Sequence, residues 1–135
     1  MKKSFLFVFF NLAVCFLAAK DYHFQTLGSL QGLSQSSAIS IWQDGWGRIW
    51  LGNDALNCYD GVNVKVYKLS EYFREVIDAD IHAFCGTDSL LYFLAEDKLL
   101  YFNLITEQFV LTGIQTDVIC SEGGELYYAN KNVLY

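Results

Sequence analysis

A pattern of short apolar segments and polar turns recurs in this chain, and it restricts the possible folds more than any other feature. With a shift of 42 residues and no gap, the coinciding residues are Ile39 with Ile81, Trp42 with Phe84, Trp50 with Tyr92, Tyr59 with Tyr101, and Tyr67 with Phe109. With a shift of 35, they are Cys85 with Cys120, Leu91 with Leu126, and Tyr92 with Tyr127. The sequence therefore predicts three successive copies of one structural unit.

Within the first copy, β-branched and aromatic residues alternate with polar turns, which is typical of short antiparallel strands. The expected strands are residues 38–43, 48–52, 56–59 and 62–67. The turns between them are rich in Gly, Asn and Asp, which suit tight turns in a chain without proline. The only helical spacing falls in residues 70–79, where we expect a linker with one turn of helix.

Repeats of about 40 residues with four short strands are typical of β-propeller blades. We predict an all-β chain whose blades are four-stranded antiparallel meanders at about 38–68, 80–110 and 115–135. A closed ring needs about four to eight blades, so two and a half blades form an incomplete ring. We expect residues 20–135 to be the opening part of a longer propeller. A single open sheet with accidental self-similarity is the alternative.

Residues 1–19 have the pattern of a secretory signal peptide. Lys2 and Lys3 precede an almost wholly apolar stretch at residues 4–17, and Ala18 and Ala19 are small enough for cleavage. An uncleaved anchor is one alternative, and a lipoprotein modified at Cys15 is another. The pattern predicts that the chain is exported.

The acidic composition argues against two classes of partner. The formal net charge is −6, whereas nucleic-acid binding and docking on anionic membranes both need a basic surface. Three cysteines remain after the signal peptide, and they lack the spacing of a zinc site. We expect Cys58, Cys85 and Cys120 to be free buried thiols. A bridge between Cys85 and Cys120 is the alternative.

No residue pattern indicates a catalytic, metal or cofactor site. Asp44 and Asp60 could form an acid–base pair, but each begins a turn beside glycine, which favours a structural role. Trp42 and Trp50 lie in expected strands and should pack in the core. Trp46 lies in a turn, where an exposed aromatic is unusual, so it is the one candidate for contact with a ligand.

Three motifs stand out within residues 22–67: Ile39-Ser40-Ile41-Trp42-Gln43-Asp44, Gly47-Arg48-Ile49-Trp50-Leu51-Gly52 and Leu56-Asn57-Cys58-Tyr59-Asp60-Gly61. Through these motifs the segment resembles the two-component regulator propeller repeat, found in the extracytoplasmic sensors of hybrid two-component systems from Bacteroidetes. The repeat residues that the resemblance identifies are Asp44, Gly47, Trp50, Gly52, Tyr59, Asp60 and Gly61. Asn53 departs from the family pattern, which usually has threonine at that position.

The resemblance implies a periplasmic sensor segment without enzymatic activity. Family members sense oligosaccharides and pass the signal through a membrane helix to a histidine kinase in the cell. It implies an oligosaccharide ligand, no cofactor, and a homodimeric parent anchored in the inner membrane by segments absent from this chain. The alternatives are a fragment of an exported propeller enzyme acting on glycans, or a truncated product without function.

Overall fold

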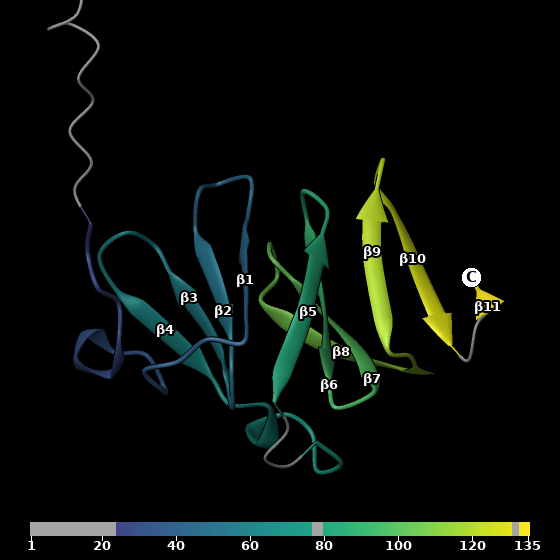
Figure 1. The fold of residues 1–135 in the computed structure, drawn as a ribbon, viewed down its shortest axis with the longest axis horizontal. Coiled ribbons are helices and arrows are strands. Elements are labelled where there is room, and N and C mark those ends of the chain that lie inside the picture. Colours follow the sequence, from purple (N-terminus) through teal and green to yellow (C-terminus); the bar gives the residue numbers. More distant parts are fainter. Residues whose placement is uncertain (1–23, 77–79, 131–132) are drawn as a thin grey trace, which may run out of the picture.

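The computed structural model describes residues 24–76, 80–130 and 133–135. These residues form three antiparallel sheets that follow one another along the chain (Figure 1). The all-β, propeller-like prediction is confirmed. The expected signal peptide lies outside the described residues. Within the described ranges, no helix is long and apolar enough to cross a membrane.

The first sheet is a four-stranded meander in which each strand pairs with the next. Its strands are β1 (Ser40–Gln43), β2 (Ile49–Gly52), β3 (Leu56–Tyr59) and β4 (Val64–Tyr67). Strands β1 and β4 begin two residues later than the sequence suggested. After β4 comes a single 3-10 turn, η2 (Leu69–Glu71), where one turn of helix was expected.

The second sheet repeats this order with longer strands. They are β5 (Ile81–Gly86), β6 (Leu90–Ala95), β7 (Lys98–Asn103) and β8 (Gln108–Gln115). Strand β8 continues past residue 110, where the second repeat was expected to end. The third sheet contains β9 (Val118–Glu122), β10 (Glu125–Asn130) and β11 (Val133–Leu134).

The pairing of residues across the strands tests the two sequence shifts that defined the repeat. In the third sheet Cys120 pairs with Tyr127, just as Cys85 pairs with Tyr92 in the second, so the shift of 35 is confirmed. The gapless shift of 42 is wrong for the first two strands of the first and second sheets, β1–β2 and β5–β6. Trp50 pairs with Trp42, but Tyr92 pairs with Cys85 rather than Phe84. A bulge at Ala83, which has φ of 53°, and a shorter turn move the register by one residue.

The first two sheets pack face to face through an aromatic core. Trp50 is fully buried, and its ring centroid lies 5.3 Å from that of Phe102 and 6.2 Å from that of Tyr67. Phe102 in turn lies 4.6 Å from Phe109. Such pairs add about 0.5–1.5 kcal/mol each beyond the burial of apolar area. This cluster therefore joins the first two sheets as neighbouring blades.

A smaller core joins the second and third sheets. Leu94 and Leu99 of the second sheet pack with Ile119 of the third. The hydroxyl of Ser121 donates to the carbonyl oxygen of Gly86 and accepts from its N–H, at 2.8 and 3.0 Å. The second blade thus packs one face on the first blade and the other on the third.

Residues 24–37, which we call the N-terminal strap, cross the opposite face of the first sheet. The strap contains a 3-10 turn, η1 (Ser29–Gln31), that ends at Gly32 with φ of 105°. Leu33 is buried, and the N–H of Ser34 donates to Oδ1 of Asn57 in β3. The strap therefore takes part of the place that a neighbouring sheet occupies elsewhere in the chain.

Candidate functional site

The turn between β1 and β2 is built around the Asp44 carboxylate. Its Oδ1 accepts the N–H groups of Trp46 and Arg48 at 3.0 and 2.9 Å. Its Oδ2 accepts Nε of Arg48 at 2.6 Å and the indole Nε1 of Trp50 at 2.9 Å. With four donors on two oxygens, this buried carboxylate is well satisfied.

These contacts set the ionisation of Asp44. Burial raises the pKa of the carboxyl, but the hydrogen bonds from Trp50 and Arg48 outweigh burial and hold the pKa below its usual value. Asp44 is therefore ionised at neutral pH and serves as an acceptor. A general acid would instead need a raised pKa.

Arg48 and Trp46 extend this cluster to the surface. The guanidinium carbon of Arg48 lies 5.1 Å from the ring centroid of Trp46 and 5.3 Å from that of Trp50. Trp46, the expected ligand candidate, is 58% exposed. The turn thus presents the Trp46 ring and the Arg48 cation at the surface. The buried residues Asp44 and Trp50 hold the Arg48 side chain in place.

The other repeat residues have structural contacts. Gly47 and Gly61 adopt positive φ in their turns. The Asp60 carboxylate accepts the N–H groups of Val62 and Asn63, at 2.8 and 2.7 Å, in an Asx turn. Hydrogen bonds from these N–H groups, that of Asn63 first, lower the pKa of Asp60. The Tyr59 hydroxyl donates to the carbonyl of Gly61 at 2.8 Å.

Gly52 lies where the second blade begins. A Cβ at this position would lie 2.4 Å from the carbonyl oxygen of Ile81 and 2.7 Å from Oγ of Ser40. The N–H of Ile81 also donates to the carbonyl of Asn53 at 2.7 Å. Glycine thus permits the first strand of the second blade to approach the second strand of the first.

Two buried amides, which the sequence analysis did not identify, connect the strap to the first sheet. Asn53 and Asn57 are almost completely buried. Oδ1 of Asn53 accepts from the Ser34 hydroxyl at 2.7 Å and from Nδ2 of Asn57 at 3.1 Å, and its Nδ2 donates to the carbonyl of Ser37. The only signal in the sequence was the departure at Asn53 from the family's usual threonine.

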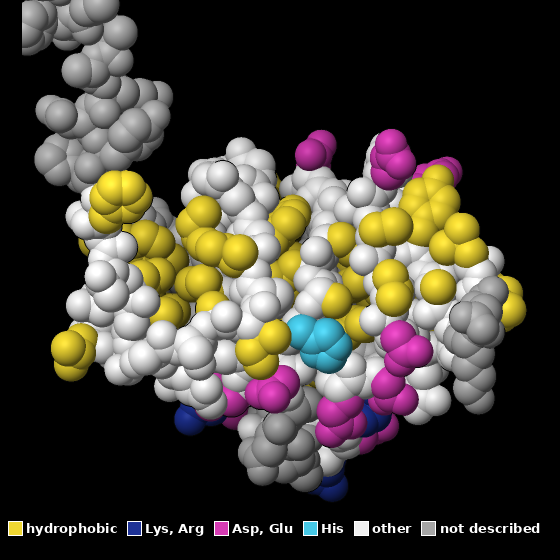
Figure 2. Space-filling model, in the orientation of Figure 1, with side chains coloured by type: hydrophobic (Ala, Val, Ile, Leu, Met, Phe, Trp, Pro, Cys, Tyr) yellow, Lys and Arg dark blue, Asp and Glu magenta, His cyan; other side chains and the backbone are white. Residues whose placement is uncertain are grey.

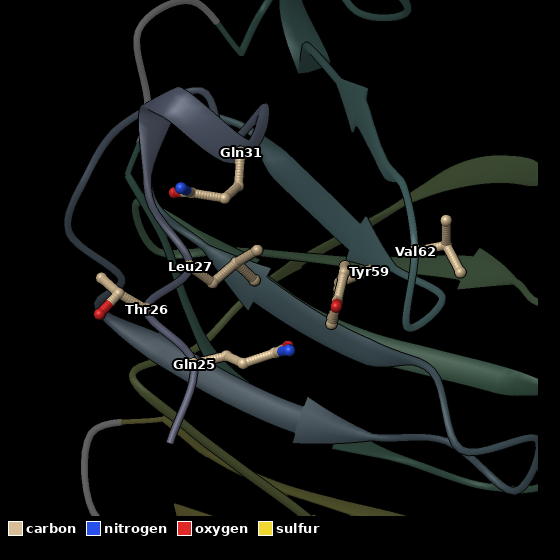
Figure 3. A pocket seen from close by; sticks show the side chains of 6 residues that line it. All are labelled: Gln25, Thr26, Leu27, Gln31, Tyr59 and Val62. Atoms are coloured by element: carbon tan, nitrogen blue, oxygen red, sulfur yellow. The ribbon is translucent and has the colours of Figure 1, made fainter. Parts of the chain in front are cut away.

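A pocket of about 400 Å³ opens between the strap and the turn that joins β3 to β4 (Figure 3). Its walls come from two separate parts of the chain. The lining residues are Gln25, Thr26, Leu27, Gln31, Tyr59 and Val62. None of them carries a charge, which separates this pocket from the charged turn around Asp44.

The surface seen in Figure 2 has hydrophobic side chains across its middle and acidic side chains along its upper and lower rims. The exposed hydrophobic residues of the molecule include Ile39 and Ile41 of the first blade and Val118 of the third. Few basic side chains are visible on this face, in keeping with the net charge of −6.

The cysteines differ in their surroundings. Cys58 and Cys85 are buried and free, as expected, and burial raises the pKa of each thiol to about 11. Cys120 is free but exposed, so the expectation that it is buried is wrong. It pairs with Tyr127 on β10, in the last of the three sheets, which is packed on one side only.

The candidate catalytic and metal groups remain apart. Asp44 is buried beneath its turn, and Asp60 is exposed at another turn, each engaged with backbone N–H groups. Among residues 24–76, 80–130 and 133–135, no group of three or more His, Cys, Asp or Glu side chains could hold a metal ion. His23 lies outside these ranges, and Nδ1 of His82 lies 3.2 Å from the carbonyl oxygen of Asp80.

Part of the chain is similar to a known protein. No family model matches the chain. Over 67 residues this chain is 37% identical to a histidine kinase of Formosa agariphila. The matched region covers 47% of this chain and 5% of that kinase. The chain therefore spans a small fraction of the length of this relative. The match supports an origin related to histidine kinases and a two-component sensor context.

Proposed function

We propose that this chain is the extracytoplasmic sensor segment of a two-component system, in which stacked blades form the scaffold for oligosaccharide sensing. The similarity to a histidine kinase over 67 residues is the observation that carries the proposal. The signal-peptide pattern of residues 1–19 supports export to the periplasm. The membrane helix and the kinase would belong to segments of the parent beyond this chain, and the parent would act as a homodimer.

The geometry of the first blade fits this scaffold role. The repeat residues Asp44, Trp50 and Gly52 are engaged in holding a turn, a core and an inter-blade contact. The exposed Trp46 lies on a turn, and most of the lining of the strap pocket lies on the strap. Binding sites commonly lie on loops positioned by a rigid framework.

Two measurements test the proposal. Residues 1–24, fused to an alkaline phosphatase that lacks its own leader, should give phosphatase activity, because this enzyme is active only after export. The full chain should bind at least one oligosaccharide on an array of plant, algal and host glycans. Cytoplasmic retention of the fusion would contradict export, and the absence of saccharide binding would contradict the sensing role.

A further inference from the structure

The strap pocket has the chemistry of a site for a neutral, hydroxyl-rich ligand. Its lining contains two amides and two hydroxyls but no charged side chain. A charged ligand would lose hydration there without gaining an opposite charge. Its volume of about 400 Å³ lies within the range of small-molecule sites, about 300–1,000 Å³.

The two amides supply both donors and acceptors. Oε1 of Gln31 accepts the N–H of Gly28 at 2.9 Å, which fixes the amide and leaves Nε2 as a donor. The Gln25 side chain makes no hydrogen bond to any residue in the described part of the chain. In Figure 3 both amides border the space beside Leu27. A ligand hydroxyl can pair with either group, because it also donates and accepts.

The pocket also offers an apolar surface. The Tyr59 ring is held by the hydrogen bond from its hydroxyl to the carbonyl of Gly61. Leu27 and Val62 add aliphatic groups, and Figure 3 shows Leu27 on the strap, between the two amides, with Tyr59 across the space from it. A ligand that fits must therefore combine hydroxyl groups with an apolar C–H face.

We infer that the strap pocket binds one neutral pyranose unit, with its hydroxyls on Gln25 and Gln31 and its C–H face on Tyr59. This inference rests on the proposed function, and it assigns the oligosaccharide contact to this chain. The unit could be a free monosaccharide or part of an oligosaccharide. A pocket that opens to solvent between the strap and a turn admits both.

Isothermal titration of the full chain tests this inference. The probes are neutral hexasaccharides of glucose, xylose and mannose, the corresponding monosaccharides, and an oligogalacturonate as the acidic comparison. We expect at least one neutral probe to bind and the oligogalacturonate not to bind at this site. Equal affinity for the monosaccharide and the hexasaccharide, per site, would identify a single-unit site. A tighter hexasaccharide would place further units outside the pocket.

Substitutions locate the site. Gln25→Ala should weaken binding of the neutral probe about tenfold, equivalent to one hydrogen bond of about 1.4 kcal/mol. The matched control is Gln108→Ala, at an exposed glutamine on β8, and it should leave affinity unchanged within twofold. Tyr59→Phe should retain binding because it keeps the ring, whereas Tyr59→Leu should lose it.

The outcomes separate this inference from the proposed function. If a neutral saccharide binds the wild type, Gln25→Ala and Tyr59→Leu with equal affinity, the pocket assignment is overturned while the sensor role stands. If only oligogalacturonate binds, the neutral ligand class is overturned. If no saccharide binds, both proposals fail. Melting temperatures of each variant, measured in parallel, show whether lost binding follows from unfolding.

Discussion

The indole nitrogen of Trp50 donates a 2.9 Å hydrogen bond to the carboxylate of Asp44, six residues earlier in the chain. The same Trp50 ring packs on Phe102 of the second sheet. One residue pair thus connects the β1–β2 turn to the interface between two blades. The turn aspartate and the strand tryptophan of the first blade therefore act together.

Replacing Trp50 tests this connection. Trp50→Phe removes the donor to Asp44 and reduces the packed area, so it should lower the free energy of unfolding by about 2–4 kcal/mol. Trp46→Phe is the control, because Trp46 is exposed, and it should change stability by less than about 0.5 kcal/mol. Urea unfolding measures both. If the two variants lost similar amounts of unfolding free energy, the Asp44–Trp50 contact would not contribute to stability as proposed.

Gly52 should not tolerate a side chain. Gly52→Ala brings a Cβ to 2.4 Å from the carbonyl oxygen of Ile81, and part of the backbone must move. We expect a loss of about 2 kcal/mol or more in the free energy of unfolding. Gly45→Ala is the matched control, since nothing lies within 4 Å of its Cβ position. If thermal unfolding shows both variants equally stable, the close approach of β5 to β2 is wrong.

The stability of the chain should fall in acid because of Asp44. The pKa of this carboxyl is lowered in the folded state, so its contribution is complete above its usual value of 3.8 and is lost as the pH falls through the folded value. Asp44→Asn should be less stable at pH 7 and show a smaller decrease between pH 5 and pH 3. Urea midpoints across this range provide the measurement. An unchanged slope in the variant would assign the acid sensitivity to other carboxylates.

The three cysteines that follow the expected signal peptide should react at different rates. Cys120 is exposed, whereas Cys58 and Cys85 are buried with a pKa of about 11, which leaves little thiolate at pH 7.5. Iodoacetamide should therefore modify Cys120 first, and the other two only after denaturant is added. Peptide mass spectrometry identifies the sites. Rapid labelling of Cys85 in the native chain would contradict the packing of the third sheet on the second.

The sequence predicted the blades better than the details of their contacts. Strand β3 was placed correctly, and the shift of 35 agrees with the register, because Cys120 pairs with Tyr127 as Cys85 pairs with Tyr92. The shift of 42 aligned Phe84 with Trp42, but Cys85 occupies the equivalent position in the sheet. The one-residue bulge that causes this difference cannot be recognised from the spacing of aromatic residues. Bulges depend on local backbone geometry, and a single sequence gives few signals for them.

The position of the N-terminal strap was not predicted from the sequence. Its residues lie outside the repeat, so no internal comparison indicated that they cover the first sheet. Asparagine side chains are seldom buried, so the sequence did not suggest that Asn53 and Asn57 lie in the interior. Their hydrogen bonds to Ser34 join segments that are distant in the sequence and are seen only in the structure. The strap pocket depends on this docking and was therefore not predicted.

The sensor role is tested most directly by a transcriptional response in the native organism. The gene that encodes this chain is deleted in frame and then restored, and transcripts are measured after addition of the oligosaccharides that bind the chain. The account predicts that one gene set is induced in the wild type, that the deletion abolishes this induction, and that restoration recovers it. Equal induction in the wild-type and deleted strains would contradict the proposed function.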